Sequence, residues 1–145
     1  MDNKIESFTI VLPVKLISKA NYRQDRKGDQ WRKYQAFNLE LGTLIKAILP
    51  QNWLGEGKVE GERDLCYYYV GIIANSRLDV GNYSKSILDA LERIVYMDDK
   101  AVKYSFSYQD DRLSKEEIKV VCGRSSMDNN QIKDKEIITW LNNQI

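Results

Sequence analysis

The residues that could do chemistry lie close together in the chain, between positions 77 and 99. Asp79 lies a few residues past an apolar stretch, Lys85 comes shortly after it, and the acidic pair Asp98-Asp99 ends the region. Carboxylates of this kind can hold a divalent cation against a phosphate, and an ammonium group beside them can offset developing negative charge. The pattern therefore indicates metal-assisted chemistry on a phosphate ester.

Each of these residues also has an ordinary structural explanation. Asp79 could cap the following helix, because aspartate is among the best N-cap residues. Lys85 and Asp89 have the spacing of an exposed ion pair on a helix. The pair Asp98-Asp99 could simply occupy a turn. The residues taken singly leave both explanations open, and their combination favours a metal site.

The chain contains no histidine. Serine and cysteine protease triads need an imidazole base, and most zinc sites need an imidazole ligand, so these classes are excluded. A metal site in this chain would have to use oxygen ligands. Such ligands suit Mg²⁺, with Mn²⁺ as the alternative.

Length and composition predict one domain over residues 1–145. The chain is long enough to bury a single core, and its 43% hydrophobic and 30% charged residues argue against disorder. No apolar run approaches the roughly 20 residues of a membrane-spanning helix, and the first residues lack the pattern of a secretory signal. Cys66 and Cys122 lie in apolar runs and are expected to be core residues. We therefore expect a cytoplasmic protein without a membrane partner or a nucleotide cofactor.

Hydrophobic periodicity predicts the elements that must position the site. In chain order these are a strand over 5–16, a helix over 31–49, a central strand over 64–75, a helix over 80–96, a hairpin of strands 101–108 and 118–122, and a short terminal helix. The order β-α-β-α-β-β-α predicts an α/β (α+β) fold, with helices packed on a mixed sheet. Asp79 would lie between the central strand and the second helix, where such folds commonly build sites.

Two helices are expected to turn an apolar stripe toward the sheet. In the first, the stripe consists of Trp31, Tyr34, Phe37, Leu41, Leu44, Ile45 and Ile48. In the terminal helix it consists of Ile137, Ile138 and Leu141. Pro13 predicts that the first strand lies at an edge of the sheet or ends there.

A basic segment runs from Lys15 to Lys33, although the net charge of the chain is only +1. Its basic residues are Lys15, Lys19, Arg23, Arg26, Lys27, Arg32 and Lys33. They alternate with Tyr22 and Trp31, as in a loop that contacts phosphates. The alternative is a solvated surface loop that leads into a helix.

The stretch Arg77–Lys85 resembles the motif of the RusA family of Holliday-junction endonucleases, and Asp89-Ala90-Leu91 and Asp98-Asp99 match its later parts. A weaker similarity covers Ser18–Arg23 and Trp31–Tyr34. The resemblance extends over about residues 5–122, which leaves 124–145 as a C-terminal extension with a short helix.

The resemblance implies a homodimeric endonuclease that resolves four-way DNA junctions in recombination and repair, with Mg²⁺ as cofactor. It implies that Asp79, Asp98 and Asp99 are catalytic and bind the metal, and that Lys85 is the catalytic cation near the cleaved phosphate. The residues expected to contact DNA are Lys19, Asn21, Arg23, Arg26, Lys27, Arg32, Lys33 and Arg77.

The sequence departs from the family motif at Gly81, where the second of two alternating aspartates is expected. Glycine offers no oxygen ligand. Another acidic residue, such as Glu62, Asp64 or Asp89, could supply the missing carboxylate. Alternatively, the protein could keep the fold as a catalytically silent module that binds DNA structures or another protein.

Overall fold

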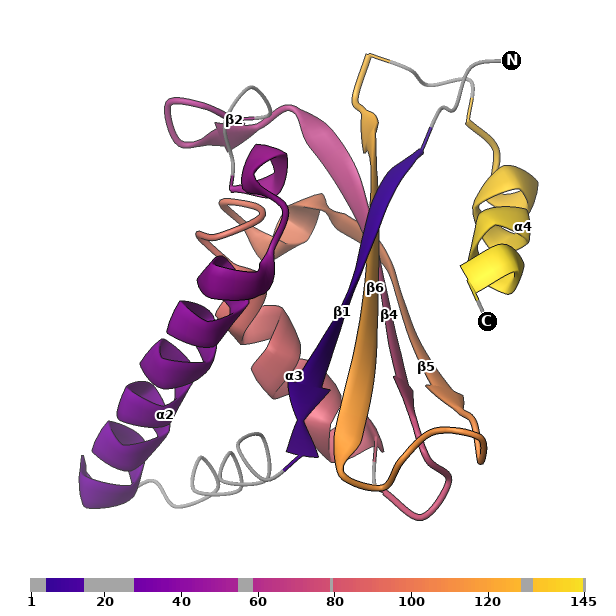
Figure 1. The fold of residues 1–145 in the computed structure, drawn as a ribbon. Helices are drawn as coiled ribbons and strands as arrows, with labels where there is room; N and C mark the ends of the chain where they lie inside the picture. The colour runs from indigo at the N-terminus through magenta and orange to yellow at the C-terminus, as the bar shows by residue number, and fades with distance from the viewer. Residues whose placement is uncertain (1–4, 15–27, 55–58, 79, 129–131, 145) are drawn as a thin grey trace.

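A mixed four-stranded sheet forms the centre of the fold (Figure 1). The structure is a computed structural model, and it describes residues 5–14, 28–54, 59–78, 80–128 and 132–144. The strands are β1 (Glu6–Pro13), β4 (Cys66–Ala74), β5 (Val102–Gln109) and β6 (Glu117–Ser126), in the spatial order β1-β6-β4-β5. The predicted α+β fold with a mixed sheet is confirmed.

Strand β4 is central, as its apolar sequence predicts. It pairs antiparallel with β6 and parallel with β5, so neither of its edges is free. Almost every residue from Cys66 to Ala74 is buried, because a strand with neighbours on both sides and helices on both faces has no solvent-exposed side. Strand β1 lies at the edge of the sheet and ends at Pro13, as predicted.

The predicted hairpin of residues 101–108 and 118–122 is wrong in its pairing. Both segments are strands, β5 and β6, but β4 lies between them. The pattern identified both segments as strands correctly, although only β5 alternates in burial and β6 is buried on both faces. Periodicity carries no information about which strand pairs with which. The chain reaches β5 from β4 through a helix, which is the connection that parallel strands require.

Helices cover both faces of the sheet (Figure 1). Helices α2 (Gly28–Ile48) and α3 (Val80–Leu91) lie on one face, and α4 (Asp134–Gln144) lies on the other. Helix α3 is shorter than the predicted 80–96, because the chain turns at Arg93. That residue has a φ of 68°, in the left-handed region where helices commonly end. No helix in the described part of the chain is long and apolar enough to cross a membrane.

A small hairpin precedes β4 and was not predicted. Its strands are β2 (Val59–Glu60) and β3 (Arg63–Asp64), and Gly61 adopts a φ of 63° at the turn. Two short 3₁₀ turns, η2 (Gln51–Trp53) and η3 (Asp99–Ala101), complete the described elements. Two-residue strands are too short to produce a recognisable period, so the sequence does not reveal this hairpin.

The main core lies between the sheet and helices α2 and α3. Its fully buried side chains include Leu12, Leu41, Ile45, Ile72, Ile87, Leu91, Ile118 and Val120. Cys66 and Cys122 belong to this core as free thiols, as predicted, and burial raises the pKa of the Cys122 thiol. Ile48 was predicted to face the core but is 41% exposed. It is the last residue of α2, and the next residue, Leu49, is buried in the core in its place.

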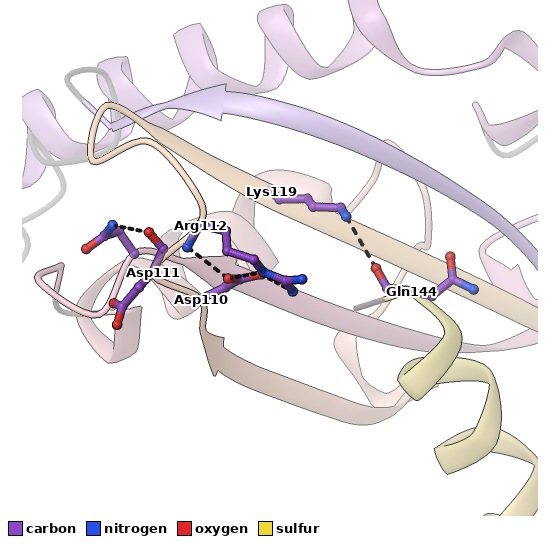
Figure 2. Close-up of polar contacts among 6 residues, drawn as sticks. Asp110, Asp111, Arg112, Lys119 and Gln144 are labelled. Atoms are coloured by element: carbon purple, nitrogen blue, oxygen red, sulfur yellow. Dashed lines mark hydrogen bonds and ion pairs between the residues drawn. The ribbon is translucent and has the colours of Figure 1, made fainter.

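A second core lies under α4, where Tyr69, Ile132 and Ile137 are buried against Trp140. Ile138 was predicted on the apolar side of this helix, but it is 51% exposed. Adjacent helical positions are about 100° apart, so a helix that buries Ile137 through a narrow stripe turns Ile138 away. At the C-terminal end of α4, the Lys119 ammonium donates a hydrogen bond to the carbonyl oxygen of Gln144 at 3.3 Å (Figure 2).

Gly123 permits α4 to approach the sheet, and its replacement by alanine should loosen that contact. A Cβ atom at this position would lie 2.7 Å from the Trp140 ring and 2.9 Å from Ile5. We expect Gly123→Ala to cost about 1–3 kcal/mol of unfolding free energy through overpacking, measured as a lower Tm by calorimetry. Gly71→Ala is the matched control, because its Cβ would meet the flexible tip of Leu141 at 3.3 Å. Equal Tm values for the two variants would contradict this account.

Candidate metal centre

Three carboxylates gather at the C-terminal end of α3. Within the described residues, Glu92, Asp98 and Asp99 each offer an oxygen, and these oxygens lie within 4.8 Å of one another. Glu92 is half-buried, and the two aspartates are exposed. A donor set made only of carboxylate oxygens fits Mg²⁺ or Mn²⁺ and does not suit zinc, which favours nitrogen and sulfur ligands. The residues present therefore fit the metal that the chemistry requires.

The turn after α3 brings these carboxylates together. With Arg93 in the left-handed conformation, the chain reverses, and the Arg93 N–H donates to the carbonyl oxygen of Tyr96 at 2.5 Å. The buried Tyr96 hydroxyl in turn donates to the carbonyl oxygen of Leu88 at 2.7 Å. Burial raises the pKa of Tyr96, so this hydroxyl stays neutral and remains a donor. The reversal directs the following residues back toward Glu92.

Asp98 is held as a carboxylate by its place at the start of η3. Its side chain accepts a hydrogen bond from the backbone N–H of Lys100 at 2.9 Å. This bond is the main cause of a lowered pKa at Asp98. The side chain is therefore ionised at neutral pH, which is the state that a metal ligand needs.

Asp64, at the end of the small hairpin, contacts the same turn from the other side. It is only 6% exposed, and it accepts hydrogen bonds from the N–H groups of Met97 and Asp98 at 2.8 and 3.0 Å. Its oxygens are thus directed at the main chain. Among the described residues, the third carboxylate beside the predicted aspartate pair comes from Glu92, and the group does not include Glu62, Asp64 or Asp89.

Glu92 was not singled out in the sequence, although one signal was available. It follows the last residue of α3, where the helix dipole disfavours negative charge. An acidic residue at such a position, a few residues before an acidic pair, is a candidate for another role. The sequence position of Glu92 indicates a metal ligand only once the turn at Arg93 is known, because that turn brings Glu92 beside the acidic pair.

The residues before α3 lie at the other end of this helix from the three carboxylates. Asp79 lies outside the described residues; its neighbours are Leu78, in the turn after β4, and Val80, the first residue of α3. The turn is held by Asn75, whose side-chain oxygen accepts from the Arg77 N–H at 3.0 Å. The Asn75 amide donates to the carbonyl oxygen of Leu113 at 2.9 Å.

Hydrogen bonds hold the loop between β5 and β6 where it contacts the turn after β4. The Arg112 guanidinium donates two hydrogen bonds to the Asp110 carboxylate, at 2.9 and 2.8 Å (Figure 2). These bonds lower the pKa of Asp110 to about 2. The Ser76 hydroxyl donates to the Asp111 carboxylate from the β4 side. Asn75, Ser76 and this loop therefore support the backbone that leads into α3.

Lys85 and Asp89 lie along α3, between its two ends. Their side chains form an ion pair at 3.9 Å, and Lys85 remains largely exposed. The helix has 12 residues, so its ends are separated by about 18 Å at 1.5 Å per residue. Within one chain, the turn before Val80 and the carboxylates of Glu92, Asp98 and Asp99 are therefore at opposite ends of α3.

The predicted DNA contacts are only partly described. Arg32 on α2 and Arg77 after β4 are exposed, as a phosphate contact requires. Lys33 lies in α2, but its side chain is outside the description. The basic loop residues Lys19, Asn21, Arg23, Arg26 and Lys27 lie outside the described residues.

A cavity of about 680 Å³ adjoins the carboxylates. It lies between the small hairpin and η3, and its charged lining includes Arg63, Asp64, Asp98 and Lys100. Asp98 is accessible from this cavity, whose lining is more acidic than basic because Glu62 and Asp128 also belong to it.

Comparison with known proteins identifies a family. The family model described as endodeoxyribonuclease RusA matches residues 13–121, which is more than half of the chain. A search of curated proteins found no matching relative. The matched range contains both ends of α3 and all three carboxylates, and it ends before α4.

Proposed function

This chain belongs to the RusA family of endodeoxyribonucleases, which resolve Holliday junctions, and on that premise we propose that it cuts four-way DNA junctions with Mg²⁺ at a site shared by two chains. Family membership confirms the resemblance inferred from the stretch Arg77–Lys85. Nucleases of this family are metal-dependent. The observation that carries the proposal is the carboxylate group of Glu92, Asp98 and Asp99 within the matched range.

Each side chain has a role that its chemistry supports. Asp98, Asp99 and Glu92 would hold the ion, and Glu92 would provide the carboxylate that Gly81 lacks. When bound, a magnesium ion would polarise the phosphate and activate a water molecule. Lys85 is exposed and could place its ammonium beside the phosphate, where it would offset developing charge. Asp79 would add a carboxylate from the start of α3.

The separation of the two ends of α3 supports a homodimer. One chain cannot easily offer Asp79 and the pair Asp98-Asp99 to one ion across about 18 Å of helix. In a dimer with two-fold symmetry, the start of α3 in one chain can lie beside the end of α3 in its partner. Each of the two resulting sites would then contain residues from both chains, and a junction would meet two sites.

Strand β5 provides an edge through which such a dimer could form. It pairs only with β4 among the described strands, has no proline and carries a single charged residue, Lys103. Exposed edges of this kind readily pair with another chain. Antiparallel pairing of two β5 strands about Ser105 would set Tyr104 opposite Phe106 of the partner subunit, an aromatic pair that favours the register.

The same pairing orients the two halves of the site. The start of β5 follows Asp98 and Asp99, and its end lies beside the start of α3, where Ser84 and Ser107 are hydrogen-bonded at 3.1 Å. Antiparallel pairing therefore brings the acidic end of one chain toward the α3 start of the other. Arg32, Arg77 and the basic loop from Lys15 would contact phosphates outside the site. The buried free thiols fit a reducing cytoplasm.

Cleavage of a labelled four-way junction by the purified full-length protein tests the proposed function. We expect cleavage with Mg²⁺ or Mn²⁺, none with excess EDTA, and weaker cutting of a linear duplex of the same sequence. Binding of the junction without cutting under all metal conditions would instead favour the silent module suggested by Gly81.

A further inference from the structure

We propose that Asp64 is a positioning residue for the metal centre: its buried carboxylate holds the main chain at Met97 and Asp98, so that the two aspartates stay within reach of Glu92. The inference rests on the proposed metal centre. It concerns a residue that does not belong to the carboxylate group itself, because both Asp64 oxygens accept hydrogen bonds from backbone N–H groups.

The geometry of Asp64 is that of an anchor. One oxygen accepts from Met97 at 2.8 Å, and the other accepts from Asp98 at 3.0 Å. Two donors on two oxygens restrict both the position and the rotation of the turn relative to the carboxylate. Hydrogen bonds to an ionised group are about twice as strong as neutral ones. At 6% exposure, water competes little for these oxygens.

The anchored segment depends on such support. Met97 and Asp98 belong to no helix or strand, and they connect the reversal at Arg93 to η3. A connecting segment without regular backbone pairing is free to shift unless side chains hold it. Asp64 is the last residue of the small hairpin, where it pairs with Val59. The hairpin, directly before β4, therefore places this acceptor at the turn that carries the metal ligands.

Asp64→Asn should weaken metal binding without removing any of the proposed ligands. The side-chain amide has the same size but can accept at one atom only, and its NH₂ group would face a backbone N–H. Partners that orient metal ligands typically contribute 10- to 100-fold to metal affinity. We expect the Kd for Mn²⁺ to rise by about 10- to 100-fold.

The primary measurement is Mn²⁺ binding to the full-length protein by isothermal titration calorimetry, without DNA. A second measurement is junction cleavage against Mg²⁺ concentration. Asp64→Asn should shift half-maximal cleavage to higher Mg²⁺, and excess Mg²⁺ should recover the rate while the KM for the junction stays unchanged. Asp64→Ser, whose hydroxyl can still accept one N–H, should also bind Mn²⁺ more weakly than the unmodified chain. It serves as the second variant if Asp64→Asn does not fold.

Tyr69→Phe is the matched control. It removes a buried hydrogen bond between the hydroxyls of Tyr69 and Ser125, 2.5 Å apart, under α4 on the opposite face of the sheet. It should lower the Tm and leave the Kd for Mn²⁺ unchanged. The proposal is overturned if folded Asp64→Asn lowers the Tm in the same way but binds Mn²⁺ like the unmodified chain.

The test separates this inference from the proposed function. An unmodified chain that binds no Mn²⁺ would overturn the positioning role together with the metal centre. An unmodified chain that binds Mn²⁺ but cuts no junction would contradict the proposed function, while the Kd values of the Asp64 variants would still confirm or overturn the positioning role.

Discussion

Glu92→Gln is expected to reduce junction cleavage by at least about 100-fold, because it neutralises one of the carboxylates that would hold the metal. Metal-ion stabilisation of a transition state is worth several kcal/mol, and each 1.36 kcal/mol corresponds to a tenfold change in rate. Glu92 is the ligand that would compensate for Gly81. Its loss should therefore leave the metal more weakly held than in a site with a full set of aspartates.

The substitution is nearly isosteric, so the turn at Arg93 should keep its shape. Removing a negative charge from the C-terminal end of α3 should even help the helix slightly, since the dipole disfavours an acid there. We therefore expect an unchanged or slightly higher Tm together with the loss of cleavage, measured under single-turnover conditions. Glu117→Gln is the control, because Glu117 is an exposed glutamate at the start of β6. Full activity in Glu92→Gln would show that Glu92 is no ligand.

A mixture of two inactive variants is expected to regain cleavage if the site is shared between chains. Asp79→Asn and Asp98→Asn should each be inactive alone. In a mixed dimer, one site carries both substitutions and the other carries neither. Random mixing makes half of the dimers mixed, so about a quarter of all sites should be intact. Any recovery starts from a nearly zero background and is therefore a large effect.

Single-strand nicking of a labelled junction measures the recovery, since one intact site suffices for one cut. The chains should be mixed under conditions that allow subunits to exchange. The matched control mixes Asp98→Asn with Asp99→Asn. Both substitutions affect the same end of α3, so a mixed dimer carries a damaged carboxylate group at each site and should stay inactive. Recovery confined to the first mixture supports a shared site. Failure of both mixtures to recover, although the chains exchange, would contradict it.

Most elements of the fold were predictable because their patterns are long. Strand β4 and helices α2 and α3 each bury a continuous set of side chains. Burial of this kind requires apolar residues at regular positions along the segment, and that pattern can be seen in the sequence. The pairing of the strands could not be predicted from the sequence in the same way. The segments of β5 and β6 looked like a hairpin, and only the packed structure shows β4 between them. Periodicity describes what a strand buries and carries no information about its neighbours.

By itself, the sequence determined the class of chemistry. The absence of histidine, the spacing of Asp79, Lys85 and Asp98-Asp99, and the family motif all indicated a metal-dependent nuclease, because these properties depend on residue type and local spacing. Only the tertiary structure revealed that α3 separates Asp79's neighbours from the acidic pair, that Glu92 joins this pair, and that Asp64 anchors it. The last two relations depend on the left-handed turn at Arg93 and on a two-residue strand, and neither feature leaves a periodic signal in the sequence.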